Sequence, residues 1–90
     1  MAVNVRIPAP LRPLVGGQSQ VECEPGTVRD LIDQLDGQYA GFRDRVMQDG
    51  SLRRFVNVFV AGDDVRFADG IDTQVGDGQE VTILPAVAGG

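Results

Sequence analysis

The chain contains no histidine and no lysine, and its only cysteine is Cys23. Without histidine, the protein cannot form a Ser-His or Cys-His nucleophile pair or a histidine-ligated metal site. A single cysteine excludes an intramolecular disulfide and a metal site built from several cysteines. These absences leave no residue to assign to such a nucleophile pair or to a metal site of these kinds.

Long apolar runs and basic runs are also absent. The first 20 residues contain three prolines and two arginines but no continuous apolar block, which predicts neither a signal peptide nor a membrane-spanning helix. The net charge of −5 argues against nucleic acid or an anionic membrane as a partner and favours a basic protein surface. We expect a cytoplasmic protein.

The chain is long enough for one globular domain with one core, because 42 % of its 90 residues are hydrophobic. Alternation of apolar and polar residues predicts one strand over residues 2 to 8 and another over residues 19 to 24. The prolines between them and the Gly16-Gly17 pair favour a hairpin loop over a polyproline ligand. Cys23 alternates with Val21 in the second strand, so we expect its thiol to be buried in the core.

A helix is predicted after the second strand. Thr27, followed three residues later by Asp30, resembles a capping box at the start of a helix. An apolar stripe with helical spacing follows, made of Val28, Leu31, Ile32 and Leu35. We expect this stripe to cover the sheet and the helix to end at Gly37. A weaker helical pattern over residues 40 to 48 ends at Asp49-Gly50 and predicts one or two further turns.

Residues 55 to 60 show the strongest strand pattern, with three valines expected on the core side. Phe59 would then lie on the solvent side of the sheet with Leu84 of the last strand, as a docking patch or as incidentally exposed residues. Residues 65 to 67 are predicted as a further short strand. The segment from there to residue 78 is expected to be irregular, since its Asp-Gly pairs indicate turns rather than a calcium site.

The last strand is predicted over residues 81 to 84. Pro85 ends it, because proline has no amide hydrogen to donate to a neighbouring strand. This divides the chain into a domain over residues 1–85 and a flexible tail over residues 86–90. Six extended residues, counted from Pro85, span at most about 20 Å, which is enough to enter the cleft of another protein.

The tail ends in Gly89 and Gly90. Because glycine has no Cβ, the terminal carbonyl carbon is open to attack from either side. The ionised carboxylate is a poor electrophile and must first be activated, for example as a mixed anhydride with ATP. A frayed terminus is the alternative interpretation, but the strand and proline directly before the tail favour a functional one.

The predicted order is strand, strand, helix, short helix, strand, short strand, strand. A hairpin followed by a crossover helix and further strands indicates a mixed sheet with its helix packed on one face. This is the order of the α+β, ubiquitin-like β-grasp fold. In that fold the first and last strands lie side by side in the middle of the sheet, so the tail would leave from a rigid element.

The family resemblance is carried by two stretches of the sequence: residues 54 to 60 with residues 64 to 67, and residues 81 to 90. With the size and the element order, they resemble the MoaD/ThiS superfamily of ubiquitin-like sulfur carriers, and most closely its CysO-type members of cysteine biosynthesis. The resemblance covers the whole chain. The terminal Gly-Gly is the only strict motif of the superfamily.

The resemblance implies that an E1-like adenylyltransferase and sulfurtransferase adenylates Gly90 with ATP and converts it to a thiocarboxylate. In the CysO-type route, the sulfur attacks an aminoacrylate on a PLP-dependent, cysteine-synthase-like enzyme, and a metalloprotease releases the product. ATP and PLP would be held by these partners, so the carrier itself would bind no cofactor. It would be a cosubstrate and not an enzyme, so we assign no catalytic and no metal-ligating residue. Phe59, Leu84, Val87 and Ala88 are the residues expected to dock against the partners.

Three other functions are compatible with the sequence. The carrier could deliver sulfur to molybdopterin, thiamin or a specialised metabolite. A ubiquitin-like protein modifier would instead join Gly90 to target lysines through amide bonds. A plain β-grasp interaction module would make no use of its tail.

Overall fold

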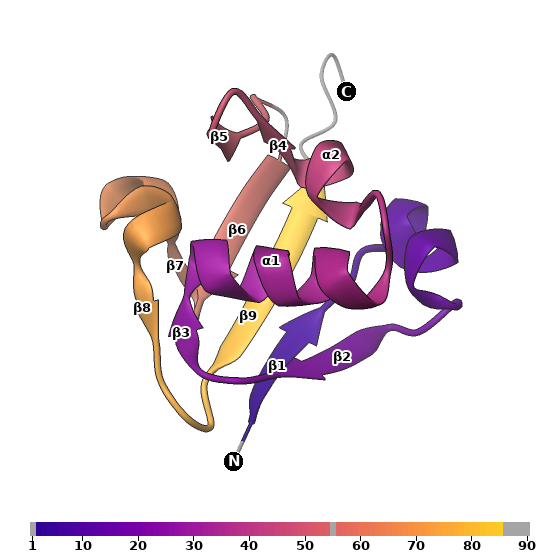
Figure 1. Cartoon of the computed structure of the whole chain (residues 1–90). Coiled ribbons are helices and arrows are strands. Elements are labelled where there is room, and N and C mark those ends of the chain that lie inside the picture. Colours follow the sequence, from indigo (N-terminus) through magenta and orange to yellow (C-terminus); the bar gives the residue numbers. More distant parts are fainter. Residues whose placement is uncertain (1, 55, 86–90) are drawn as a thin grey trace.

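The computed structural model describes residues 2–54 and 56–85 (Figure 1). Its main sheet has five strands, which are, in spatial order, β2 (Gln20–Cys23), β1 (Val3–Arg6), β9 (Glu80–Pro85), β6 (Val56–Val60) and β7 (Asp63–Asp64). The first and last strands, β1 and β9, are parallel neighbours in the middle of the sheet, and every other pair in it is antiparallel. This arrangement confirms the predicted β-grasp sheet.

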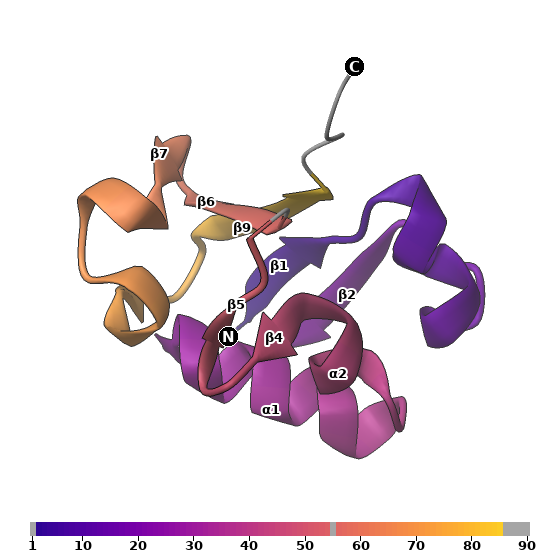
Figure 2. The ribbon, with the colours of Figure 1, turned by 90° about the horizontal axis from the view of Figure 1, so that it is seen from above.

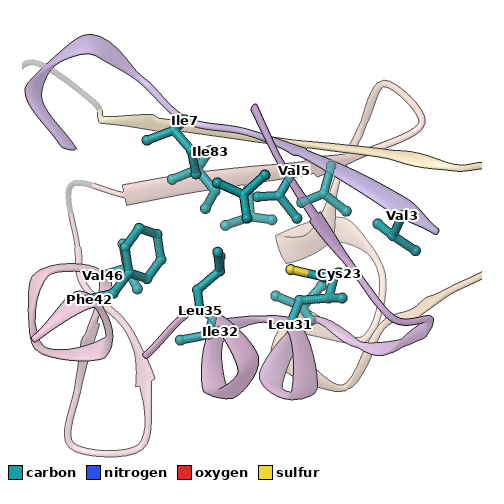
Figure 3. Close-up of a cluster of buried hydrophobic side chains, with 14 of the residues drawn as sticks. Val3, Val5, Ile7, Cys23, Leu31, Ile32, Leu35, Phe42, Val46 and Ile83 are labelled. Atoms are coloured by element: carbon teal, nitrogen blue, oxygen red, sulfur yellow. The ribbon is translucent and has the colours of Figure 1, made fainter. Parts of the chain in front are cut away.

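The main helix, α1 (Val28–Gln38), covers one face of the sheet (Figure 1). Its predicted stripe of Val28, Leu31, Ile32 and Leu35 is buried. Alternate residues of the strands meet this stripe, among them Val5 of β1 and Ile83 of β9 (Figure 3). The second helix, α2 (Phe42–Val46), closes the core at the end of α1 with buried Phe42 and Val46.

The predicted capping box is present at the start of α1. The Thr27 side chain accepts a hydrogen bond from the Asp30 amide at 3.1 Å, and the Asp30 carboxylate accepts one from the Thr27 amide at 3.0 Å. The bond from the Thr27 backbone is the main reason why the pKa of Asp30 is lowered. The predicted end at Gly37 is wrong, because α1 continues to Gln38 and Gly37 is not left-handed. The left-handed glycine between the two helices is Gly41, the N-cap of α2.

Short elements connect the sheet to the helices, and the sequence predicted few of them. The link between β1 and β2 is not only a loop, since it contains the 3-10 helix η1 (Ala9–Val15). The strands β4 (Met47–Gln48) and β5 (Ser51–Leu52) form a hairpin whose turn is Asp49-Gly50. In the segment expected to be irregular, η3 (Gly70–Asp72) precedes β8 (Gln74–Val75), which pairs with β3 (Gly26–Thr27) before α1.

The predicted strand over residues 65 to 67 is also wrong. These residues form the 3-10 helix η2 (Val65–Phe67), and only Asp63–Asp64 pair with β6. The Asp64 carboxylate accepts a hydrogen bond from the Arg66 amide at 2.9 Å, which caps the helix and ends the strand. As a result, Phe67 is 91 % exposed instead of alternating in a sheet.

Candidate functional site

The candidate site is the point where the chain leaves the sheet at the end of β9. Gly89 and Gly90, the predicted acyl-carrier terminus, and Val87 and Ala88, predicted to dock, lie outside the described residues, as does Phe55. Their roles therefore stay predictions. The structure does describe the base of this segment, which is strand β9.

That base is held on both sides. β9 pairs with β1 on one side, from Asn4–Glu80 to Arg6–Thr82, and with β6 on the other, up to the Val56–Pro85 pair. Val81 and Ile83 are each 2 % exposed, so β9 is also fixed through its core face. The main-chain ladder and the buried side chains together fix the position and direction in which the chain leaves the domain.

Phe59 and Leu84 lie on the sheet face opposite α1, as predicted. Phe59 is paired with Thr82, and Leu84 is paired with Asn57, so the two apolar side chains are diagonal neighbours on β6 and β9. Leu84 is 45 % exposed, whereas Phe59 is only partly exposed. The structure thus brings the two predicted docking residues to one face, close to the end of β9.

Arg66 is a contributor to this site that the sequence reasoning missed. Its guanidinium donates hydrogen bonds to the Asn57 side chain at 2.6 Å and to the carbonyl oxygens of Val56 at 2.8 Å and Arg54 at 3.1 Å. These bonds hold the chain that leads into β6, the strand that pairs with Pro85. The sequence contains Arg66 and Asn57 in the stretch that carries the family resemblance, but no spacing rule predicts that a guanidinium from η2 will bind these acceptors.

Cys23 does not take part in the site. Its thiol lies between the sheet and α1, near Leu31 (Figure 3), and the residue is 4 % exposed. Burial raises the pKa of the thiol from its ordinary value of 9.0 to about 11. A protonated, buried thiol is a poor nucleophile, which agrees with the predicted role in the core.

We expect the folded protein to lose stability in alkali through Cys23. As the pH rises from 9 to about 11, the unfolded chain releases the thiol proton while the folded chain retains it. The free energy of unfolding should therefore fall by about 2–3 kcal/mol across this window because of this group. Urea unfolding of the natural protein and of Cys23→Ala at a series of pH values measures the effect. Equal pH dependence in the two proteins would contradict it.

A metal site and a membrane-spanning helix are both absent from residues 2–54 and 56–85. This part of the chain contains no cluster of three or more cysteine or carboxylate side chains that could hold a metal ion. The helices of this part of the chain are too short or too polar to span a lipid bilayer.

The chain is similar to known proteins over its whole length. The model of the ThiS family matches residues 5–90. The sulfur carrier protein CysO of Mycobacterium tuberculosis is 47 % identical over 93 residues, with 100 % of both chains covered. Small archaeal modifier protein 3 of Haloferax volcanii is 36 % identical over 93 residues, again with both chains fully covered.

A solved structure is similar over nearly the whole chain. A chain in the crystal structure of the Amycolatopsis orientalis BexX/CysO complex is 46 % identical, with a TM-score of 0.94, and the match covers 99 % of this chain and 100 % of that one. Identity and fold thus agree over the same length. The chain therefore belongs to the ThiS family, and it is similar over its whole length to CysO-type sulfur carriers.

Proposed function

We propose that the chain is a sulfur carrier whose C-terminal Gly90 is adenylated, converted to a thiocarboxylate and used to donate sulfur in cysteine biosynthesis. The observation that carries this proposal is the full-length identity of 47 % to sulfur carrier protein CysO. The Gly-Gly terminus and the rigid base in β9 support it, since they provide an unhindered acyl group on a short tether.

The proposed chemistry takes place in the partners and not on this chain. The Gly90 carboxylate attacks the α-phosphorus of ATP in an E1-like enzyme, pyrophosphate leaves, and an acyl adenylate forms. A sulfur donor then displaces AMP at the carbonyl carbon. Hydrosulfide gives the thiocarboxylate directly, whereas a protein persulfide gives an acyl disulfide, which a further thiol cleaves to the thiocarboxylate while forming a disulfide with the donor. The contribution of the carrier is to place one acyl carbon in successive active sites.

The later steps are assigned to two further partners. The thiocarboxylate sulfur attacks an aminoacrylate held by a PLP-dependent, cysteine-synthase-like enzyme, and a metalloprotease then cleaves the product from Gly90. We propose that Phe59 and Leu84, on the exposed sheet face, contact these partners while Val87 and Ala88 pass through the entrance of each active site. An apolar patch beside the tail gives a partner a means to recognise the folded domain as well as the terminus.

Mass spectrometry of the intact protein purified from its own host tests this function. We expect a species that is about 16 Da heavier than the unmodified chain, because sulfur replaces one oxygen. Tandem fragmentation should place the added mass at Gly90. Protein from a strain without the E1-like enzyme is the control and should lack this species. If the modification is absent under sulfur-replete growth, or lies elsewhere in the chain, the proposal is wrong.

A ubiquitin-like protein modifier is the second candidate, because small archaeal modifier protein 3 is 36 % identical over the whole chain. In that case Gly90 would be found in amide bonds to lysines of other proteins. The same purification distinguishes the two functions, since conjugates migrate at a higher mass and give branched peptides after proteolysis. Neighbouring genes for a cysteine-synthase homologue and a metalloprotease would favour the carrier.

A further inference from the structure

The end of β9 lies between two hollows that are lined with arginine. One hollow, of about 480 Å³, is lined by Arg45, Gln48, Arg53, Arg54 and Val56, on the β6 side. The other, of about 260 Å³, is lined by Arg6, Ile7, Pro8, Arg12, Thr82, Ile83 and Leu84, on the β1 side. Figures 1 and 2 show that α2, η1 and the β4–β5 hairpin gather at the end of the molecule where β9 ends.

We name four of these arginines the basic rim: Arg12, Arg45, Arg53 and Arg54. All four are exposed. Within the described part of the chain, ion pairs to carboxylates involve Arg6, Arg29 and Arg43, and none involves the rim. Arg12 and Arg53 donate Nε hydrogen bonds to backbone carbonyl oxygens, at 3.1 Å and 2.9 Å, which orient the side chains without neutralising them.

The opposite end of the sheet is acidic. Five carboxylates lie in or beside the strand ends and turns there: Glu22, Glu24, Asp63, Asp77 and Glu80. At the end with the rim, Asp44 and Asp49 are the nearest acidic residues along the chain, and neither lies within 4.0 Å of a rim guanidinium. Although the net charge is −5, the charged side chains are distributed unevenly between the two ends of β9, and the arginines lie at the end where the chain leaves the domain.

The segment after Pro85 is short, which limits how far from the rim the active site of a partner can lie. Five residues follow Pro85, and five residues reach at most about 17 Å even when fully extended. An active site that receives Gly90 must therefore open within that distance of Pro85. The surface around its entrance then faces the rim, and a complementary surface there would carry negative charge.

We propose that the basic rim docks against carboxylates around the entrance through which the adenylating enzyme takes the C-terminal residues. This inference rests on the proposed function and names the chemistry of its first partner. The net charge alone favoured a basic partner surface. The rim favours an acidic one instead, because the fold brings its arginines together at the end of the domain that the partner must approach. The rim contributes to encounter and orientation, while the chemistry stays at Gly90.

The test is a charge reversal that leaves the fold intact. Arg45 and Arg54 suit it, because neither side chain hydrogen-bonds within the described residues. The double variant Arg45→Glu/Arg54→Glu is compared with Arg29→Glu, an exposed arginine of α1 whose partner is Asp72 at 3.2 Å. ATP–pyrophosphate exchange by the E1-like enzyme of the same organism gives KM and kcat for each carrier. Circular dichroism and thermal unfolding confirm that each variant is folded.

We expect kcat/KM of the double variant to fall by about tenfold or more at low salt, mainly through KM for the carrier. The loss should shrink at high salt, because screening shortens the range of exposed charges. Arg29→Glu should change kcat/KM by less than about twofold, since its charge lies away from the tail.

The failure of this inference can be told apart from the failure of the proposed function. If the natural chain does not support exchange at all, the proposed function is wrong. If the natural chain is active and the double variant behaves like Arg29→Glu, only the rim proposal is overturned. It is also overturned if the double variant changes KM for ATP instead of KM for the carrier, or if the rim proves to bind RNA in a gel-shift assay.

Discussion

A chain that lacks Gly90 should gain sulfur at least about a hundredfold more slowly than the natural chain, because a misplacement of even 1 Å at the reacting centre can have an effect of that size. The shortened chain still ends in glycine, at Gly89, so its carboxylate is chemically the same. It is, however, withdrawn by one residue, about 3.4 Å, from where a partner would activate it. β9 cannot move outward to compensate, because its pairs with β1 and β6 and its buried Ile83 fix it in the sheet.

The measurement is the rate at which the species heavier by about 16 Da forms in a reaction reconstituted with the E1-like enzyme and a sulfur donor. Gly37→Ala is the matched control, since it also removes one glycine. A Cβ at Gly37 would meet no atom within 4 Å, and the residue already has helical backbone angles. The control should be loaded at the natural rate. Loading of the shortened chain at that rate would show that the tail does not place the acyl carbon.

The sequence predicted the parts of the fold that depend on local patterns. Strict alternation identified β1, β2, β6 and β9 and the buried side of each, because one face of each strand must pack against α1. The capping box identified the start of α1 for a similarly local reason, the satisfaction of free amides in its first turn. In both cases, the residues that form the pattern lie within a few positions of one another in the chain.

What the sequence could not predict depends on distant residues. Residues 65 to 67, expected as a strand, form a 3-10 helix whose Arg66 guanidinium binds Asn57 and Val56 of β6, and no pattern within residues 65 to 67 reveals these partners. The pairing of β3 with β8 joins two-residue strands that are too short to show any alternation. The basic rim likewise combines Arg12 with Arg54, which only the topology brings to one end of the sheet.

Only part of the candidate site could be predicted from the sequence. Phe59 and Leu84 could be placed on one face from strand periodicity, and the register of β6 against β9 confirms that placement. The contribution of Arg66 could not be foreseen, since a guanidinium can donate to any carbonyl oxygen that the fold presents. Every residue supplies a backbone carbonyl oxygen, so a site formed by such acceptors cannot be recognised from the identity of the residues.

The largest effect on stability is expected from Phe42→Ala, which should lower the free energy of unfolding by about 3–5 kcal/mol. Phe42 is fully buried, and it lies beside Val46 at the end of the core that α2 closes (Figure 3). Removing its ring takes away apolar burial and leaves a cavity, because α2 is joined to α1 by a short link and can relax only in part. A domain of this size has a total stability of about 5–15 kcal/mol, so this single substitution should remove a large part of it.

Urea unfolding followed by circular dichroism measures this change, with Phe67→Ala as the matched control. The control removes the same ring from a position that is 91 % exposed, and it should alter stability by no more than about 0.5 kcal/mol. The difference between two chemically identical substitutions then reports burial alone. If both variants lose the same stability, Phe42 is not part of the core that positions β9, and the support that the packed domain gives to the end of that strand would have to come from the main-chain ladder alone.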